Sequence, residues 1–201
     1  MNNCYLDAEA VITFFRMTGR KHIFITGSRG SGKSHLVNNM LKHMSDSFNL
    51  LQSHRTDTPQ VVIKSNLVAD NKEFVIGVPR TSGINPASKG NNMTIIEDGF
   101  INCAIPAIDT HLDTTPERLF VIDELGYLES SCIPFQKAVE KLLDNSHVLA
   151  VIRKQSTEFL NRICNRKDVL VIDIDSTFET LSCIIMASGM SKRFGSNKLI
   201  T

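Results

Sequence analysis

The stretch Gly27-Ser28-Arg29-Gly30-Ser31-Gly32-Lys33-Ser34 has the spacing G-x-x-x-x-G-K-S, and it decides the fold. The apolar run His22–Thr26 ends where this stretch begins and predicts a buried strand. Apolar residues then recur at helical spacing and predict a helix from Lys33 to about Met44. A strand, a glycine-rich loop and a helix therefore follow one another directly.

The chemistry of this loop fits a chain of phosphates. Backbone N–H groups at a helix N-terminus attract anions, and glycines let the backbone approach a phosphate without a side-chain clash. In this motif Lys33 reaches the β- and γ-phosphates, while the Ser34 hydroxyl ligates Mg²⁺. The residues expected to bind the phosphates are Gly27, Ser28, Arg29, Gly30, Ser31, Gly32, Lys33 and Ser34.

A second apolar run, Leu119–Ile122, ends in two acids, Asp123 and Glu124. Hydrolysis of a nucleotide needs an acid near the metal ion and a group that orients the attacking water. We expect Asp123 to bind Mg²⁺ and Glu124 to act as the catalytic base. This pair favours hydrolysis over nucleotide binding alone.

A cation usually completes such a site, because negative charge builds on the transferred phosphoryl oxygens. Arg29 lies within the loop. Arg153 follows the predicted strand Val148–Ile152, at the sheet edge where ligands of open α/β sheets gather. We expect Arg153 to be catalytic, together with Glu124 and Lys33.

The remaining pattern alternates strands with helices, which predicts an α/β fold with a mostly parallel central sheet and helices on both faces. The other predicted elements are a helix over Leu6–Thr18, a helix starting at Pro134, a helix over Thr157–Cys164 and a strand over Val169–Ile174.

The sequence pattern of residues from about 50 to 106 differs from that of the rest of the chain and predicts a β-rich insertion. Short β-rich runs alternate there with turn signals, one of them at Glu97-Asp98-Gly99, and an irregular loop is expected near Ser82–Asn92.

Composition excludes several classes of protein. With 42% hydrophobic residues and a net charge of +1, the 201-residue chain has no global field that would attract nucleic acid. No apolar segment approaches the ~20 residues of a membrane span, and Asp7 and Glu9 interrupt any secretory signal, so we expect a cytoplasmic protein. The five cysteines are scattered and never spaced C-x-x-C, which argues against a zinc site.

Residues Lys21 to about Asp175 resemble the THEP-type, or cancer-related, nucleoside-triphosphatases. The resemblance rests on Val121–Ser130, which contains Asp-Glu-Leu-Gly, followed by Phe135 and the helix through Ala138 and Val139. It implies a RecA-like sheet and slow, Mg²⁺-dependent hydrolysis of ATP, GTP and other nucleoside triphosphates.

The last residues show a different pattern. Ile184–Leu199 is similar to the opening signature of molybdenum-cofactor-type nucleotidyltransferases, with Ser188 and Phe194 in place of the usual alanine and methionine. We therefore expect a P-loop domain over residues 1–178 and the truncated start of a nucleotidyltransferase-like domain over residues 179–201. A fused or associated nucleotidyltransferase domain is a candidate partner.

Three functions remain open at the level of sequence. The leading hypothesis is a Mg²⁺-dependent nucleoside-triphosphatase that converts ATP- or GTP-type nucleotides to the diphosphate and phosphate. A nucleotide or small-molecule kinase would present a hydroxyl in place of water. A nucleotide-dependent partner module would serve the fused transferase.

Overall fold

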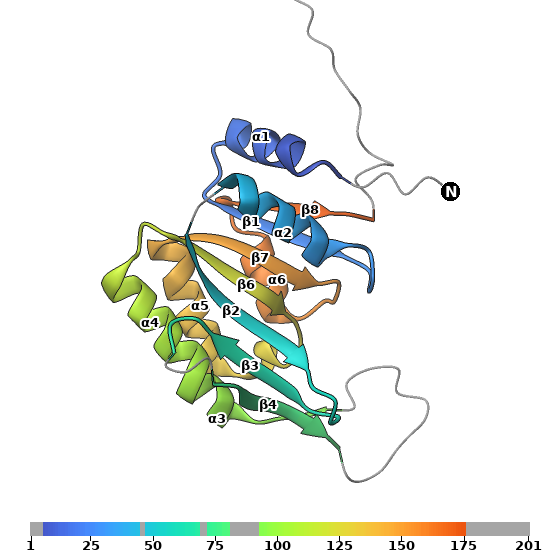
Figure 1. Cartoon of the computed structure of the whole chain (residues 1–201), viewed down its shortest axis with the longest axis vertical. Coiled ribbons are helices and arrows are strands. Elements are labelled where there is room, and N and C mark those ends of the chain that lie inside the picture. Colours follow the sequence, from blue (N-terminus) through green and yellow to red (C-terminus); the bar gives the residue numbers. More distant parts are fainter. Residues whose placement is uncertain (1–5, 45–46, 69–71, 81–92, 176–201) are drawn as a thin grey trace, which may run out of the picture.

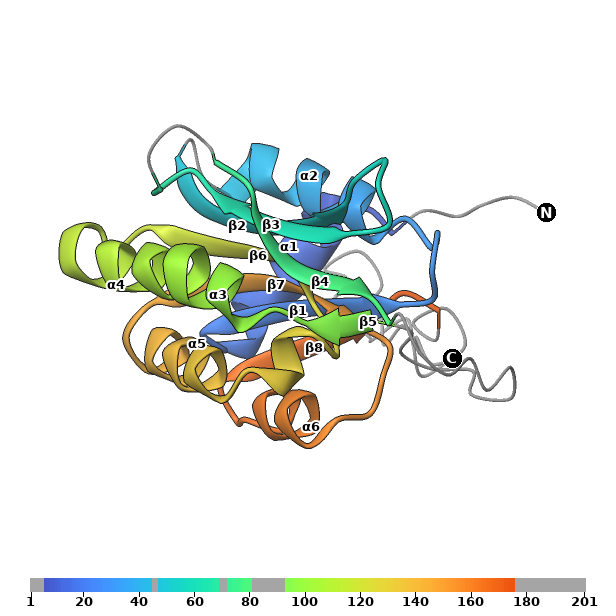
Figure 2. The same ribbon diagram turned by 90° about the horizontal axis from the view of Figure 1, so that it is seen from below.

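The computed structural model describes residues 6–44, 47–68, 72–80 and 93–175. Its described strands form one sheet in the order β5-β4-β3-β2-β6-β7-β1-β8 (Figure 1 and Figure 2). The strands are β1 His22–Gly27, β2 Phe48–Arg55, β3 Val61–Ser65, β4 Phe74–Pro79, β5 Met93–Ile95, β6 Leu119–Leu125, β7 His147–Arg153 and β8 Val169–Asp173. The predicted transferase-like start at 179–201 lies outside the described residues.

The sheet has a parallel part and an antiparallel part. Strands β2, β6, β7, β1 and β8 pair in parallel in that order, whereas β3, β4 and β5 are added antiparallel beside β2. Strand β7 therefore lies between β1, which leads into the glycine-rich loop, and β6, which carries the two acids. The prediction of an α/β fold with a mostly parallel sheet is confirmed, and the strand order is RecA-like.

Helices cover both faces of the sheet. Helices α1 and α2 pack on one face, and Figure 2 shows α5 and α6 on the face away from α2. The described helices are α1 Ala8–Thr18, α2 Lys33–Met44, α3 Glu97–Gly99, the π-helical η2 Phe100–Ala104, α4 Ile105–Thr114, the 3₁₀-helical η3 Glu129–Ser131, α5 Ile133–Asn145 and α6 Glu158–Cys164. None of them is long and apolar enough to cross a membrane.

The sheet has one hydrophobic core on each face, and the alternating direction of the side chains along β1 explains this arrangement. Neighbouring residues of a strand face opposite sides of the sheet. Phe24 accordingly belongs to the cluster built with α4, α5 and α6, while Ile23 and Ile25 belong to the cluster built with α1 and α2. A run buried on both sides is what a central parallel strand requires.

Local signals fix several helix ends. The Asp7 carboxylate caps α1 by accepting a hydrogen bond from Ala10 N at 3.2 Å, and Gly19 ends it with a φ of 64°. The Thr157 hydroxyl caps α6 through Leu160 N at 3.1 Å. Pro134 lies in the first turn of α5, where its missing N–H costs nothing.

The prediction of a turn at Glu97-Asp98-Gly99 is wrong. These residues begin a helical segment that runs through η2 and α4 to Thr114, so the β-rich region ends at Ile95. Gly99 serves close packing here, because a Cβ on it would lie 2.3 Å from the Val75 carbonyl oxygen of β4. The irregular loop expected near Ser82–Asn92 lies outside the described residues.

We expect Gly99→Ala to lower the free energy of unfolding by about 2 kcal/mol, because the added methyl group must push the helix away from the β4 backbone. Urea denaturation measures the change. Asn102→Ala, on the exposed side of the same helical segment, is the control and should change stability by less than about 0.5 kcal/mol. Equal stabilities of Gly99→Ala and wild type would contradict the packing argument.

Candidate functional site

The glycine-rich loop connects β1 to α2 at the carboxyl edge of the parallel sheet (Figure 1). Gly30 and Gly32 have φ angles of 77° and 92°, which favour glycine. At Gly27, where φ is 154°, a Cβ would lie 2.8 Å from the Ser31 hydroxyl. The glycines predicted from the motif are therefore required by the loop's own shape.

The side chain of Lys33 folds back over the glycine-rich loop. Its ammonium donates hydrogen bonds to the carbonyl oxygens of Gly27 at 2.9 Å and Ser28 at 2.8 Å. The Ser31 hydroxyl is buried and has no hydrogen-bond partner among the described residues. The positive charge predicted to hold the β- and γ-phosphates is thus fixed inside the loop that would bind them.

A carboxylate that no sequence motif marked anchors the start of the loop. Asp175 accepts hydrogen bonds from Ser28 N at 2.7 Å and from the Ser28 hydroxyl at 2.9 Å. Lys154 donates to Asp175 at 3.0 Å and pairs with Asp173 at 2.9 Å. The hydrogen bond from Lys154, followed by that from Ser28, lowers the pKa of Asp175. The loop is thereby tied to the ends of β7 and β8.

The two predicted acids lie where β6 departs from regular pairing. Asp123 pairs with Val151 and Leu125 pairs with Ile152, so Glu124 is an extra residue in the ladder. Such irregularities re-aim side chains next to active sites. Burial raises the pKa of Asp123, whereas a hydrogen bond with Gln52 and the charge of Lys33 lower it. The field of Lys33 therefore reaches Asp123 from the glycine-rich loop.

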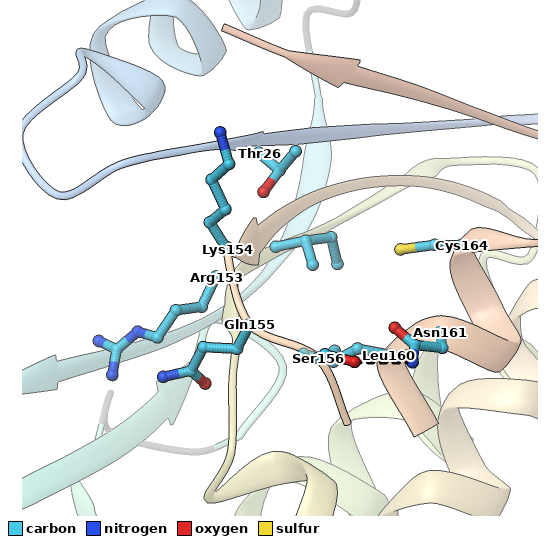
Figure 3. Close-up of a pocket in the computed structure, with 9 residues that line it drawn as sticks. Thr26, Arg153, Lys154, Gln155, Ser156, Leu160, Asn161 and Cys164 are labelled. Atoms are coloured by element: carbon cyan, nitrogen blue, oxygen red, sulfur yellow. Dashed lines mark hydrogen bonds between the residues drawn. The ribbon is translucent and has the colours of Figure 1, made fainter. Parts of the chain in front are cut away.

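Glu124 and Arg153 form an ion pair. Arg153 ends β7, the strand between β1 and β6, and Figure 3 shows its side chain pointing away from Leu160 and Cys164 of α6. The structure thus brings together the residue predicted as base and the residue predicted as transition-state cation. Arg29, the other candidate cation, lines the same hollow of the surface as Glu124 and Arg153.

Arg29, Glu124 and Arg153 line one cleft with a volume of about 620 Å³, which we call the main cleft. It is lined by Gly27, Ser28, Arg29, Ser53, His54, Arg55, Val61, Glu124, Tyr127, Leu128, Glu129, Arg153, Lys154 and Gln155. A smaller pocket of about 350 Å³ lies between the ends of β1 and β7 and helix α6 (Figure 3). Arg153, Lys154 and Gln155 line both.

Glu129 is a buried acid of the main cleft that the sequence reasoning missed. Its side chain accepts a hydrogen bond from Gly126 N at 2.9 Å, as the glutamate of a helix capping box does, and it is 5% exposed. Burial raises its pKa to about 7; the negative charge of Glu124 adds to the rise, while its backbone hydrogen bonds and Arg153 oppose it. The spacing of Gly126 and Glu129 ahead of a helix was the available signal.

Comparison with known proteins agrees with this geometry. A sequence model of a family described as NTPase matches residues 22–179. The chain belongs to this NTPase family. Nucleoside-triphosphatase THEP1 of Thermotoga sp. (strain RQ2) is 26% identical over 155 residues, which cover 76% of this chain and 86% of that protein. The Thermotoga maritima protein of the same name is 23% identical over 154 residues, with the same coverage of both chains.

Two solved structures show that the NTPase fold is shared. The crystal structure of THEP1 from the hyperthermophile Aquifex aeolicus has a TM-score of 0.60 at 18% identity, covering 79% of this chain and 95% of that one. The solution structure of a human cancer-related nucleoside triphosphatase has a TM-score of 0.57 at 20% identity, covering 76% and 88%.

Glu129 makes the stability of this NTPase depend on pH. Its pKa rises from 4.5 to about 7 on folding, so the stability that its protonated form contributes is present below about pH 4.5 and is lost as the pH rises through 7. Glu129→Gln removes this ionisation. Between about pH 5 and about pH 8, we expect the stability of this variant relative to wild type to increase by about 2 kcal/mol.

Urea denaturation at the two pH values measures the difference. The matched control is Glu158→Gln, which changes a side chain that is 97% exposed and should show no such trend. A Glu129→Gln variant whose relative stability is the same at both pH values would show that Glu129 ionises normally in the folded protein.

Proposed function

We propose that this NTPase hydrolyses ATP- and GTP-type nucleoside triphosphates to the diphosphate and inorganic phosphate in a Mg²⁺-dependent reaction. The observation that carries the proposal is the Glu124–Arg153 ion pair in the cleft that also contains the start of the phosphate loop. A base and a cation beside a phosphate site are the groups that γ-phosphoryl transfer to water needs.

Binding of the triphosphate is assigned to residues 27–34. The N-terminal N–H groups of α2 and the ammonium of Lys33 supply the positive field for the phosphates. Two hydrogens of Lys33 are engaged by loop carbonyl oxygens, and an ammonium group has three. Lys33 can therefore donate to a phosphate oxygen while it keeps the loop in shape.

The donor set fits Mg²⁺. The Ser34 hydroxyl and the Asp123 carboxylate are hard oxygen ligands, and Mg²⁺ characteristically takes one or two protein oxygens, with phosphates and water completing the shell. When bound, the ion would neutralise charge on the β- and γ-phosphate oxygens.

Glu124 is assigned the proton transfer. A water oxygen forms a bond to the γ-phosphorus as the bond from that phosphorus to the β–γ bridging oxygen breaks, and the water gives a proton to Glu124. The electron pair of the broken bond stays on the diphosphate. Arg153, already beside Glu124, can share its guanidinium with the γ-phosphoryl oxygens and stabilise their charge.

Glu124→Gln tests the assignment of the base. We expect kcat to fall by about a hundredfold or more, while the nucleotide still binds, because the amide cannot accept the proton. Phosphate release and equilibrium binding of a nucleotide analogue measure the two effects. Glu117→Gln is the matched control, because this exposed acid precedes β6 at the opposite edge of the sheet. A wild-type protein without turnover would instead favour the kinase or partner-module hypothesis.

Lys33→Ala should weaken nucleotide binding by about tenfold or more, because charge-assisted hydrogen bonds to the phosphates are lost. Isothermal titration with a non-hydrolysable triphosphate gives the dissociation constant. Lys137→Ala removes an exposed lysine on α5 and serves as the control. Equal affinities of Lys33→Ala and wild type would show that the loop does not hold the phosphates through this residue.

A further inference from the structure

The main cleft is longer than a γ-phosphate and its attacking water require. Its lining begins at Gly27 on β1, continues past Arg153 on β7 and Glu124 on β6, and ends at Arg55 on β2 and Val61 on β3. Neighbouring strands are about 4.8 Å apart, so the four steps from β1 to β3 span roughly 19 Å. The part of the cleft beyond Glu124, which we call the outer cleft, therefore has room for another group.

The cations of the cleft differ in how they are neutralised. Arg153 pairs with Glu124, and Lys154 pairs with Asp173 and Asp175. Arg29 and Arg55 also line the cleft, Arg29 at its loop end and Arg55 at its β2 end, and neither forms an ion pair with a carboxylate in the described parts of the chain. The outer cleft thus contains an exposed guanidinium that no described carboxylate pairs with.

Tyr127 is a half-buried residue of the outer cleft that is close enough to both arginines to feel their charge. Burial raises the pKa of its hydroxyl, and the positive charges of Arg153 and Arg55 oppose that rise. Because burial prevails, the hydroxyl stays protonated at neutral pH and remains a hydrogen-bond donor. Val61 and Leu128 give this part of the cleft apolar lining, which strengthens electrostatic attraction.

We propose that Arg55 and Tyr127 form a subsite for inorganic phosphate on its way out of the cleft. The proposal rests on the proposed hydrolysis, which would produce phosphate at the Glu124 end while the loop still holds the diphosphate. A planar guanidinium and a hydroxyl donor suit the several acceptor oxygens of phosphate. The outer cleft offers the departing anion a charged surface on the side away from the loop.

Product inhibition tests the subsite. The inhibition constants for inorganic phosphate and for the nucleoside diphosphate are measured for wild type, Arg55→Met and Tyr127→Phe, and their ratio is compared within each protein. That ratio cancels changes in folding or basal rate. We expect the phosphate constant to rise about five- to tenfold relative to the diphosphate constant in Arg55→Met, and less in Tyr127→Phe.

Arg118→Met is the matched control, because Arg118 is exposed and directly precedes β6 at the opposite edge of the sheet. Its ratio should equal that of wild type. An unchanged ratio in both Arg55→Met and Tyr127→Phe, with wild type still hydrolysing nucleotide, overturns the subsite alone. Absence of phosphate release from wild type overturns the proposed hydrolysis and the subsite with it.

A phosphate group can also belong to a larger molecule. A second experiment distinguishes free inorganic phosphate from such a phosphorylated molecule. Phenyl phosphate is titrated as an inhibitor of the same proteins. If free phosphate is the ligand, phenyl phosphate inhibits no better than inorganic phosphate does. The opposite result is that phenyl phosphate inhibits more strongly than inorganic phosphate does and that Arg55→Met abolishes this inhibition. That result would overturn the product assignment and identify the outer cleft as a site for a phosphorylated second substrate.

Discussion

The position of β7 between β1 and β6 is the constraint on which the site depends. Parallel strands end at the same edge of a sheet, so this order places Arg153 between the phosphate loop and Glu124. Were β1 and β6 direct neighbours, no residue of a middle strand could stand between the loop and the acids. The geometry of the site therefore depends on the pairing of β1, β7 and β6, and each helix layer contributes by burying one face of the sheet.

The charges of the site satisfy one another in pairs. Lys33 is held by loop carbonyl oxygens, Lys154 by two aspartates, and Arg153 by Glu124. A nucleotide entering such a site exchanges partners with groups that are already ordered, so the entropy of fixing long side chains is largely spent in folding. The same pairing keeps several cations close together near the start of a helix, where they would otherwise repel one another.

The sequence predicted those features that local pattern controls. The strand before the loop, the glycines, the acids after Leu119–Ile122 and the position of Arg153 at a strand end all follow from short-range spacing. The predictions from sequence failed where a contact between residues far apart in the chain determines the local structure. Gly99 looked like a turn residue because the backbone of β4 that requires it is 24 positions away. Asp175, which bonds to Ser28 across 147 positions, carried no local signal at all. The position of Arg55 in the cleft depends on the pairing of β2 with β6, which is a contact between distant parts of the sequence.

The bond between Ser28 and Asp175 also orders events in time. During synthesis, the carboxylate that anchors the first turn of the phosphate loop is made 147 residues after Ser28. Contacts of such large sequence separation form slowly, because the intervening chain must close first. The loop can be held in its described shape only after β8 has docked beside β1, so nucleotide binding should follow the docking of β8.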